Sequence, residues 1–317
     1  MKTRLTERLG IRLPVLQGGL AYLARAELAA AVSQAGGLGQ ITATTLDGPQ
    51  ALAREIASVR QRTDAPFGVN FALGRRPVDD LLEVALEAQV PVVTLTGGNP
   101  APYVERLQAA GVPWMTLVGS VRAARKAAEL GALAVIAVGF EAGGHIGRDD
   151  VTTLVLTRAI CQAVTIPVVA SGGFVDGYGL LAALALGAEG VEMGTRFVAT
   201  QESPAHPAYK RRLVESEITS TAVVERSLGR PGRVLASPTA QAIAEAEATG
   251  DEARLLQLIR GEVNRRAALE GDLDGGFVWA GQAAGLIRDL PSAAELLSRM
   301  MQEFEAALGR IQEIWEG

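Results

Sequence analysis

Eight short apolar runs, each followed by a stretch with helical periodicity, constrain the fold more than any other feature of this sequence. The runs have the length of strands. Because they are mostly apolar rather than alternating, we expect them to be covered on both faces, as in a parallel sheet flanked by helices. The runs are Pro14–Gln17, Leu38–Thr42, Phe67–Phe71, Val90–Leu95, Trp114–Val118, Ala132–Val138, Pro167–Ala170 and Gly190–Gly194.

Several of the intervening helices can be read from the glycines that follow them. Helical patterns over residues 26–34, 121–130 and 180–186 are followed by Gly36, Gly131 and Gly187, and glycine readily takes the left-handed conformation that ends a helix. Eight strand and helix units in succession predict an α/β fold, a (β/α)8 TIM barrel. An open doubly wound sheet is the weaker alternative, because no Gly-x-Gly-x-x-Gly motif opens a helix after the first strand.

The pattern changes after Phe197. Residues 203–266 are rich in Ala, Glu and Arg and read as helical, with no strand alternation, and a glycine-rich stretch follows at 271–282. A last amphipathic helix is expected from about Ser292 to Trp315. We therefore predict a barrel domain from residues 1–199 and 291–317, and a helical insertion after the eighth strand, residues 200–290, that caps the mouth of the barrel as a substrate domain.

Composition restricts the compartment and the partners. The net charge of −5, without a long basic stripe, argues against nucleic acid and anionic membrane surfaces. The single cysteine excludes an internal disulfide and a multi-cysteine zinc site. No signal peptide is visible behind the first charged residues, and the apolar runs are far too short to span a membrane. The sequence predicts a soluble, cytoplasmic protein.

Glycine-containing turns follow the seventh and eighth strands, at Ser171-Gly172-Gly173 and Met193-Gly194-Thr195. In a TIM barrel the active site lies at the carboxyl ends of the strands, and the loops after strands seven and eight often hold phosphate. Backbone N–H groups beside glycine, together with the Thr195 hydroxyl, are suitable donors for it. The two turns together predict a ligand that carries a phosphate group.

Two other strand ends suit a flat ring system. The first strand is followed by Gly18-Gly19-Leu20, whose backbone can lie under a ring, and the third carries Asn70. The side-chain amide of Asn70 can donate to and accept from the edge of a heterocycle. An equally good interpretation is that Asn70 ties down a loop.

His145 is the best acid/base candidate, since an imidazole exchanges protons near neutral pH. It lies in the glycine-rich segment Gly139–Gly147, directly after the sixth strand. Glu141, four residues earlier, could orient it, contact ligand hydroxyls or be a surface carboxylate. His206, between prolines, is expected to be structural. The two histidines lack any metal-binding spacing, so a catalytic zinc or iron site is not expected.

Taken together, five motifs resemble the nitronate monooxygenase family, formerly called 2-nitropropane dioxygenases. This family also includes flavin-dependent enoyl-[acyl-carrier-protein] reductases and NADH:quinone reductases. The resemblance covers nearly the whole chain, including the late segments Asp272–Gly276 and Ala280–Gln282. The motifs are Pro14–Gly19, Pro66–Asn70, Glu141–His145, Ala170–Gly173 and Met193–Phe197.

The resemblance implies that the barrel binds FMN and that His145 stands over the flavin as the catalytic acid/base or electrostatic group. By motif, Gly172, Gly173, Gly194 and Thr195 would cradle the phosphate, in the same turns as Ser171 and Met193. The remaining cofactor-binding residues would be Gly18, Gly19 and Leu20 facing the ring, Asn70 meeting it, and Gly144 lining the pocket beside His145.

The leading functional hypothesis is a monooxygenase that oxidises alkyl nitronates with O2. The alternative keeps FMN but uses NAD(P)H to reduce an enoyl thioester or a quinone. One departure weakens the quinone reading, since Trp114–Val118 contains no lysine where quinone-reducing members carry one. A non-redox isomerase, lyase or binding barrel is a third class, but the strand ends lack the lysine or paired carboxylates that it would use. The expected partners are therefore a small-molecule substrate with O2 or NAD(P)H, and a homodimer is left open.

Overall fold

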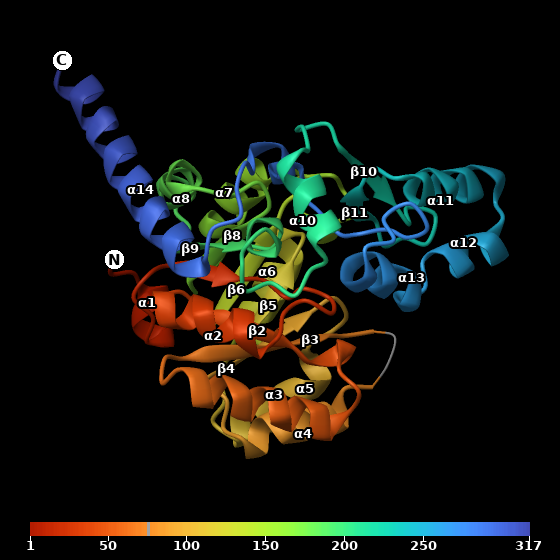
Figure 1. Ribbon diagram of the computed structural model, residues 1–317. Coiled ribbons are helices and arrows are strands. Elements are labelled where there is room, and N and C mark those ends of the chain that lie inside the picture. Colours follow the sequence, from red (N-terminus) through yellow and green to blue (C-terminus); the bar gives the residue numbers. More distant parts are fainter. Residues whose placement is uncertain (75–76) are drawn as a thin grey trace.

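Eight parallel strands form a ring in the part of the chain that the computed structural model describes, residues 1–74 and 77–317 (Figure 1). Their order around the ring is β1-β9-β8-β6-β5-β4-β3-β2. Backbone hydrogen bonds from Gln17 N to Leu38 O and from Leu38 N to Val15 O, both 2.9 Å, join its two ends. The strands are β1 Val15–Gln17, β2 Gly39–Thr42, β3 Phe67–Ala72, β4 Val92–Thr96, β5 Trp114–Val118, β6 Ala134–Val138, β8 Val168–Ser171 and β9 Gly190–Met193.

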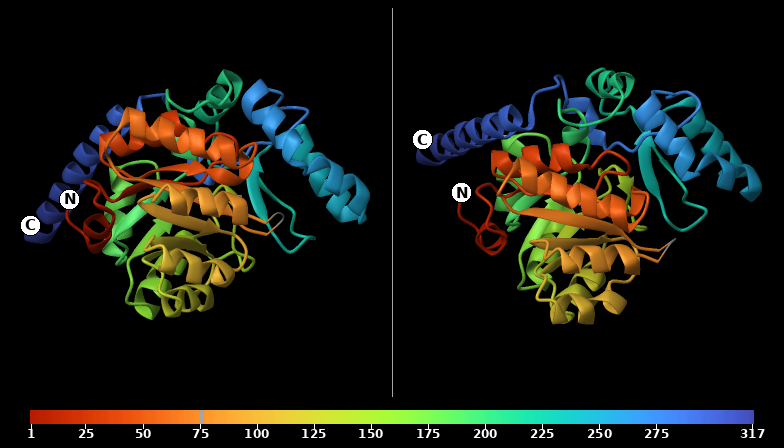
Figure 2. Two further views of the ribbon diagram at one scale, coloured as in Figure 1. Left: turned by 90° about the horizontal axis from the view of Figure 1, so that it is seen from below. Right: turned by 60° about the horizontal axis from the view of Figure 1, so that its bottom comes forward.

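Each of the eight apolar runs overlaps one of these strands, so the predicted (β/α)8 barrel is confirmed. Helices cover the outer face of the ring in all views (Figures 1 and 2). The three predicted helix-ending glycines, Gly36, Gly131 and Gly187, have φ angles of 107°, 84° and 97°. The outer helices are α2 Ala26–Ala35, α3 Pro49–Arg62, α4 Asp79–Glu87, α5 Ala101–Ala109, α6 Val121–Glu129, α7 Thr153–Ala163, α8 Gly177–Ala185 and α14 Ala293–Glu316.

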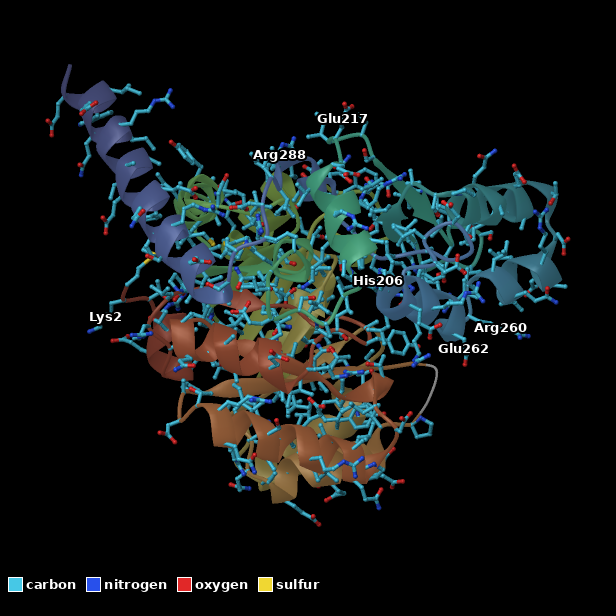
Figure 3. The ribbon with its side chains drawn as sticks, in the orientation of Figure 1. Lys2, His206, Glu217, Arg260, Glu262 and Arg288 are labelled. Atoms are coloured by element: carbon cyan, nitrogen blue, oxygen red, sulfur yellow. The ribbon has the colours of Figure 1, made fainter. Side chains whose placement is uncertain are left out.

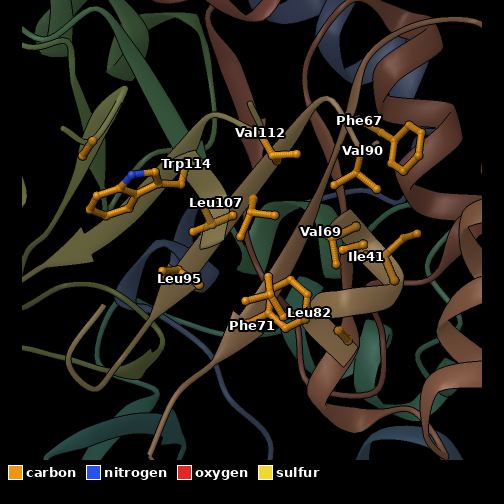
Figure 4. Packing of buried hydrophobic residues seen from close by; sticks show 14 of the residues in the cluster. Ile41, Phe67, Val69, Phe71, Leu82, Val90, Leu95, Leu107, Val112 and Trp114 are labelled. Carbon is orange, nitrogen blue, oxygen red and sulfur yellow. The ribbon is translucent and has the colours of Figure 1, made fainter. Parts of the chain in front are cut away.

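Two layers of apolar side chains hold the barrel together. Between the strands and the outer helices, Phe71 and Trp114 from the sheet pack in one cluster with Leu82 and Leu107 from α4 and α5 (Figure 4). Inside the ring, Leu5 from the short helix α1, Arg4–Leu9, packs in a second cluster with side chains of the strands. Since Leu5 lies beside Gly190, the first residue of β9, α1 covers the amino end of the barrel and leaves the carboxyl end free.

The elements between α9 and α14 lie beside one end of the ring (Figure 2), and we refer to residues 200–290 as the lobe. The sequence predicts no strands in this lobe, and that prediction is wrong. It contains β10, Thr221–Val224, and β11, Gly232–Leu235, and β11 also pairs with β7, Gly144–His145. β10 and β11 are each four residues long, and the third strand of their sheet, β7, comes from the loop after β6. No stretch of alternating apolar and polar residues is therefore long enough to reveal this sheet in the sequence.

The other elements of the lobe are helical. They are α10 Pro207–Val214, α11 Pro238–Thr249, α12 Glu252–Leu258, α13 Gly261–Arg265, a π-helical turn at Arg266–Glu270 and a 3-10 turn at Gln282–Leu286. Two more short helical segments, a 3-10 turn at Ala43–Thr45 and α9 at Thr195–Val198, follow β2 and β9. Within residues 1–74 and 77–317, none of the helices combines the length and apolarity needed to cross a bilayer.

Candidate active site at the carboxyl end of the barrel

The loop after β1 packs directly on side chains from β3 and β9. A Cβ atom on Gly19 would lie 2.5 Å from Asn70 Oδ1, and one on Gly18 would lie 3.1 Å from Glu192 Cδ. Gly18 N also donates a hydrogen bond to Met193 O at 3.0 Å. The structure therefore brings together Gly18, Gly19 and Asn70, and adds Glu192, which the sequence analysis did not single out.

Two buried polar atoms at this place have no partner within the described chain. Asn70 is 2% exposed and its Nδ2 makes no hydrogen bond, and Glu192 is 5% exposed with an unpartnered Oε2. Buried polar groups are nearly always hydrogen-bonded. The two atoms, one a donor and the other an acceptor when ionised, are therefore candidates for contact with a ligand at this end of the barrel.

Glu192 is held at its other oxygen only. Ser171 Oγ donates to Glu192 Oε1 at 3.1 Å, across the paired strands β8 and β9. Burial raises the pKa of Glu192 to about 7, and the Ser171 hydrogen bond opposes this shift. Glu192 can therefore gain or lose a proton near neutral pH.

The loops after β8 and β9 lie side by side at the same end of the barrel, because their strands are neighbours. Gly172 and Gly173 have φ angles of 100° and 91°, a conformation that favours glycine. Thr195 Oγ1 accepts a hydrogen bond from Gly281 N at 2.9 Å, which leaves the hydroxyl hydrogen free to donate. Gly194 packs beside Leu20, since a Cβ atom at 194 would lie 3.3 Å from Leu20 Cδ2.

His145 lies on β7, at the border between barrel and lobe. Its side chain is 52% exposed, and its ring centroid is 5.0 Å from that of Trp279. His145 Nε2 is 3.8 Å from Oε2 of Glu225, a buried carboxylate that also lies 2.9 Å from Arg230 Nη2. The preceding residue, Gly144, has a φ of 79°, and the space where its Cβ would point is open.

Glu141 does not orient His145. Its Oε2 accepts hydrogen bonds from Thr153 N at 2.7 Å and Thr153 Oγ1 at 2.8 Å, at the first residue of α7. The carboxylate that does face the imidazole, Glu225, is 80 positions later in the chain, and no signal near His145 pointed to it. His206 Nδ1 accepts from Ala208 N at 3.1 Å and caps α10, in agreement with its expected structural role (Figure 3).

The late glycine-rich segment covers the loop that carries His145. Gln282 N donates to Glu141 O at 3.0 Å, and a Cβ atom on Gly143 would lie 2.6 Å from Gly281 N. Together with the bond from Gly281 to Thr195, these contacts join the loops after β6 and β9 through one segment of the lobe. The lobe therefore contributes directly to the mouth of the barrel.

Comparison with known proteins gives consistent matches over the whole chain. A family model described as "Nitronate monooxygenase" matches residues 2–303. A nitronate monooxygenase of Pseudomonas aeruginosa is 35% identical, over 96% of this chain and 99% of that protein. A (3aS,4S,5R,7aS)-5-hydroxy-7a-methyl-1-oxo-octahydro-1H-indene-4-carboxyl-CoA dehydrogenase of Mycobacterium tuberculosis is 34% identical, over 95% of both chains. Among solved structures, FabK from Thermotoga maritima superposes with a TM-score of 0.94 and 43% identity, over 99% of both chains.

Proposed function

Because this chain belongs to the nitronate monooxygenase family, we propose that it binds FMN at the carboxyl end of its barrel and oxidises alkyl nitronates with O2. The relatives are named as a monooxygenase and a dehydrogenase, and this chain is an oxidoreductase of the same family. The observation that carries the FMN proposal is the pair of unpartnered buried atoms, Asn70 Nδ2 and Glu192 Oε2, at this end of the barrel.

The residues at the mouth fit a flavin. Gly18 and Gly19 leave room for the side chains of Glu192 and Asn70, and Asn70 would offer its free donor to a ring carbonyl. The backbone at Gly172–Gly173 and Gly194, with the Thr195 hydroxyl, would hold the phosphate. Ser171 and Met193 support this arrangement through Glu192 and Gly18, and Leu20 packs beside Gly194.

When bound, a flavin would take electrons from the substrate and pass them to O2. In the proposed mechanism His145 binds the anionic nitronate or moves a proton at Nε2, the atom that faces Glu225. The Glu225 carboxylate faces that nitrogen at 3.8 Å and is itself paired with Arg230. Trp279 restricts the imidazole by packing against it, and Gly144 leaves room for the substrate beside it.

A second candidate is the NAD(P)H-dependent reduction of an enoyl thioester. It is favoured by the 43% identity with FabK and by the match to an enzyme named as a carboxyl-CoA dehydrogenase. Cationic side chains near His145 also suit a carrier with phosphate groups. Arg230 is held by Glu225, and the exposed Arg148 lies near Gly229 on the same side of the lobe.

One set of assays tests both candidates. The protein is purified, supplied with FMN and examined for flavin absorption, and a chain that stays colourless would refute both. Oxygen uptake with propyl nitronate supports the first candidate. Rapid bleaching of the flavin by NADH, followed by recovery on addition of crotonyl-CoA, would overturn the first candidate in favour of the second.

A further inference from the structure

Glu192 is a buried carboxyl group to which the proposed reaction assigns no proton transfer. It is the next-to-last residue of β9, and its side chain points into the barrel beside Gly18, one of the two glycines proposed to lie against the flavin ring. Its Oε2 has no partner, whereas Oε1 is held by Ser171. A carboxyl group in this position must either bond to the ligand or carry a proton.

No charge in the described chain compensates Glu192. The neighbouring strands supply Gly18 from the end of β1 and Ser171 from β8, neither of which is charged, and Asn70 comes from β3. In the segment after β6, Glu141 is bonded to Thr153, His145 faces Glu225 and Asp150 pairs with Arg226. Apart from burial, only the Ser171 hydrogen bond affects the pKa of this carboxyl group.

We propose that Glu192 is a proton-linked positioning residue of the cofactor site, which takes up a proton when the bound flavin is reduced and releases it when the flavin is reoxidised. This inference rests on the proposed binding of FMN. A buried carboxylate without a cation repels added negative charge, so it becomes a better base when an anionic ring lies beside it.

The step balances as follows. Two electrons and one proton from a reductant such as NADH or dithionite leave the flavin with one negative charge at neutral pH. A second proton, taken from water, converts the Glu192 carboxylate into a neutral carboxyl group. When an oxidant removes the two electrons, the flavin loses its charge and Glu192 returns its proton to water.

This coupling predicts how the affinity for reduced FMN depends on pH. Glu192 should have one pKa when oxidised flavin is bound and a higher pKa when reduced flavin is bound. Between these two values, each rise of one pH unit should lower the affinity for reduced FMN about tenfold relative to the affinity for oxidised FMN. For a two-electron couple this adds about 30 mV per pH unit to the slope of the midpoint potential. Glu192→Gln keeps the shape of the side chain but cannot ionise, so it should lack the added slope.

The test is the midpoint potential of bound FMN, measured by dye-linked reduction with dithionite between about pH 5.5 and 9, where a carboxyl group with a pKa near 7 titrates. A matched control is Glu189→Gln, the same substitution in the turn before β9, where the side chain pairs with Arg4 away from the site. The control should keep the steep slope. Ser171→Ala removes the bond that favours the ionised form, so it should move the steep interval to higher pH.

The outcomes separate the two proposals. If the wild-type chain binds no FMN, the proposed function and this inference both fail. If FMN binds and the slope is the same in wild type and Glu192→Gln, the inference is wrong while the FMN proposal stands. If Glu192→Gln does not fold, Ser171→Ala decides instead, and an unmoved steep interval in that variant overturns the inference.

Discussion

Gly19→Ala offers the most direct test of the packing between the loop after β1 and Asn70. The added Cβ would lie 2.5 Å from Asn70 Oδ1 and 2.6 Å from its Cγ, closer than real Cβ contacts allow. Asn70 is buried on β3, so it has little room to move. Such overpacking costs about 1–3 kcal/mol of the free energy of unfolding. The displaced amide should also lose its bond to FMN, which weakens FMN binding about fivefold to tenfold.

The assay combines urea denaturation with a double-mutant cycle. In an Asn70→Ala background the clash partner is gone, so Gly19→Ala should then cost little stability. Gly309→Ala is the matched control, because nothing lies within 4 Å of its added Cβ and it replaces glycine within helix α14. It should stabilise the protein by about 0.5–1 kcal/mol. An equal cost of Gly19→Ala with and without the Asn70 side chain would refute the reasoning.

Three further predictions follow from the site and its surroundings. His145→Ala should retain FMN but slow turnover by about 10²–10⁴-fold, which steady-state kinetics would measure, and unchanged turnover would exclude a catalytic role. Thr195→Val removes a phosphate donor and the acceptor for Gly281 N, so FMN affinity by fluorescence titration should fall about 10–100-fold, and an unchanged affinity contradicts the assignment of this loop. Asp289→Asn should lower the melting temperature at pH 7. The hydrogen bond from Arg299 lowers the pKa of Asp289, so the stability it contributes is present above its unfolded pKa and lost as pH falls through the lower folded value. The difference from wild type should therefore shrink below about pH 4, and a difference that persists in acid would rule out this ion pair as its cause.

Much of the barrel could be predicted because its signals are local. Trp114–Val118, for example, is apolar except for Thr116, because helices cover one side of its strand and the barrel interior covers the other. Gly36 ends α2 in a left-handed conformation that its own lack of a side chain makes accessible. The strands of the lobe gave no such signal, since Gly232–Leu235 is short and its partner Gly144–His145 lies far away in the sequence.

The candidate site was only partly visible in the sequence. The glycines after β1, β8 and β9 could be recognised from their positions at strand ends, although their contact with FMN remains a prediction. Glu192 was missed, but there was a signal for it, because a carboxylate inside an otherwise apolar strand run needs a reason to be buried. Glu225 and Trp279 had no such signal, since each meets His145 only through folding of the lobe.

The sequence by itself determined the alternation of strands and helices, the end of the barrel at which the polar and glycine-rich turns gather, and His145 as a candidate proton carrier. These follow from periodicity and from the conformations that each residue type can adopt within its own segment. Only the tertiary structure decided that Glu141 caps α7 while Glu225 faces His145, and that Glu192 lies under Gly18 with an oxygen left unpartnered. The reason is physical: hydrogen bonding and burial of a charged group depend on atoms that closure of the barrel and docking of the lobe bring together from distant parts of the chain.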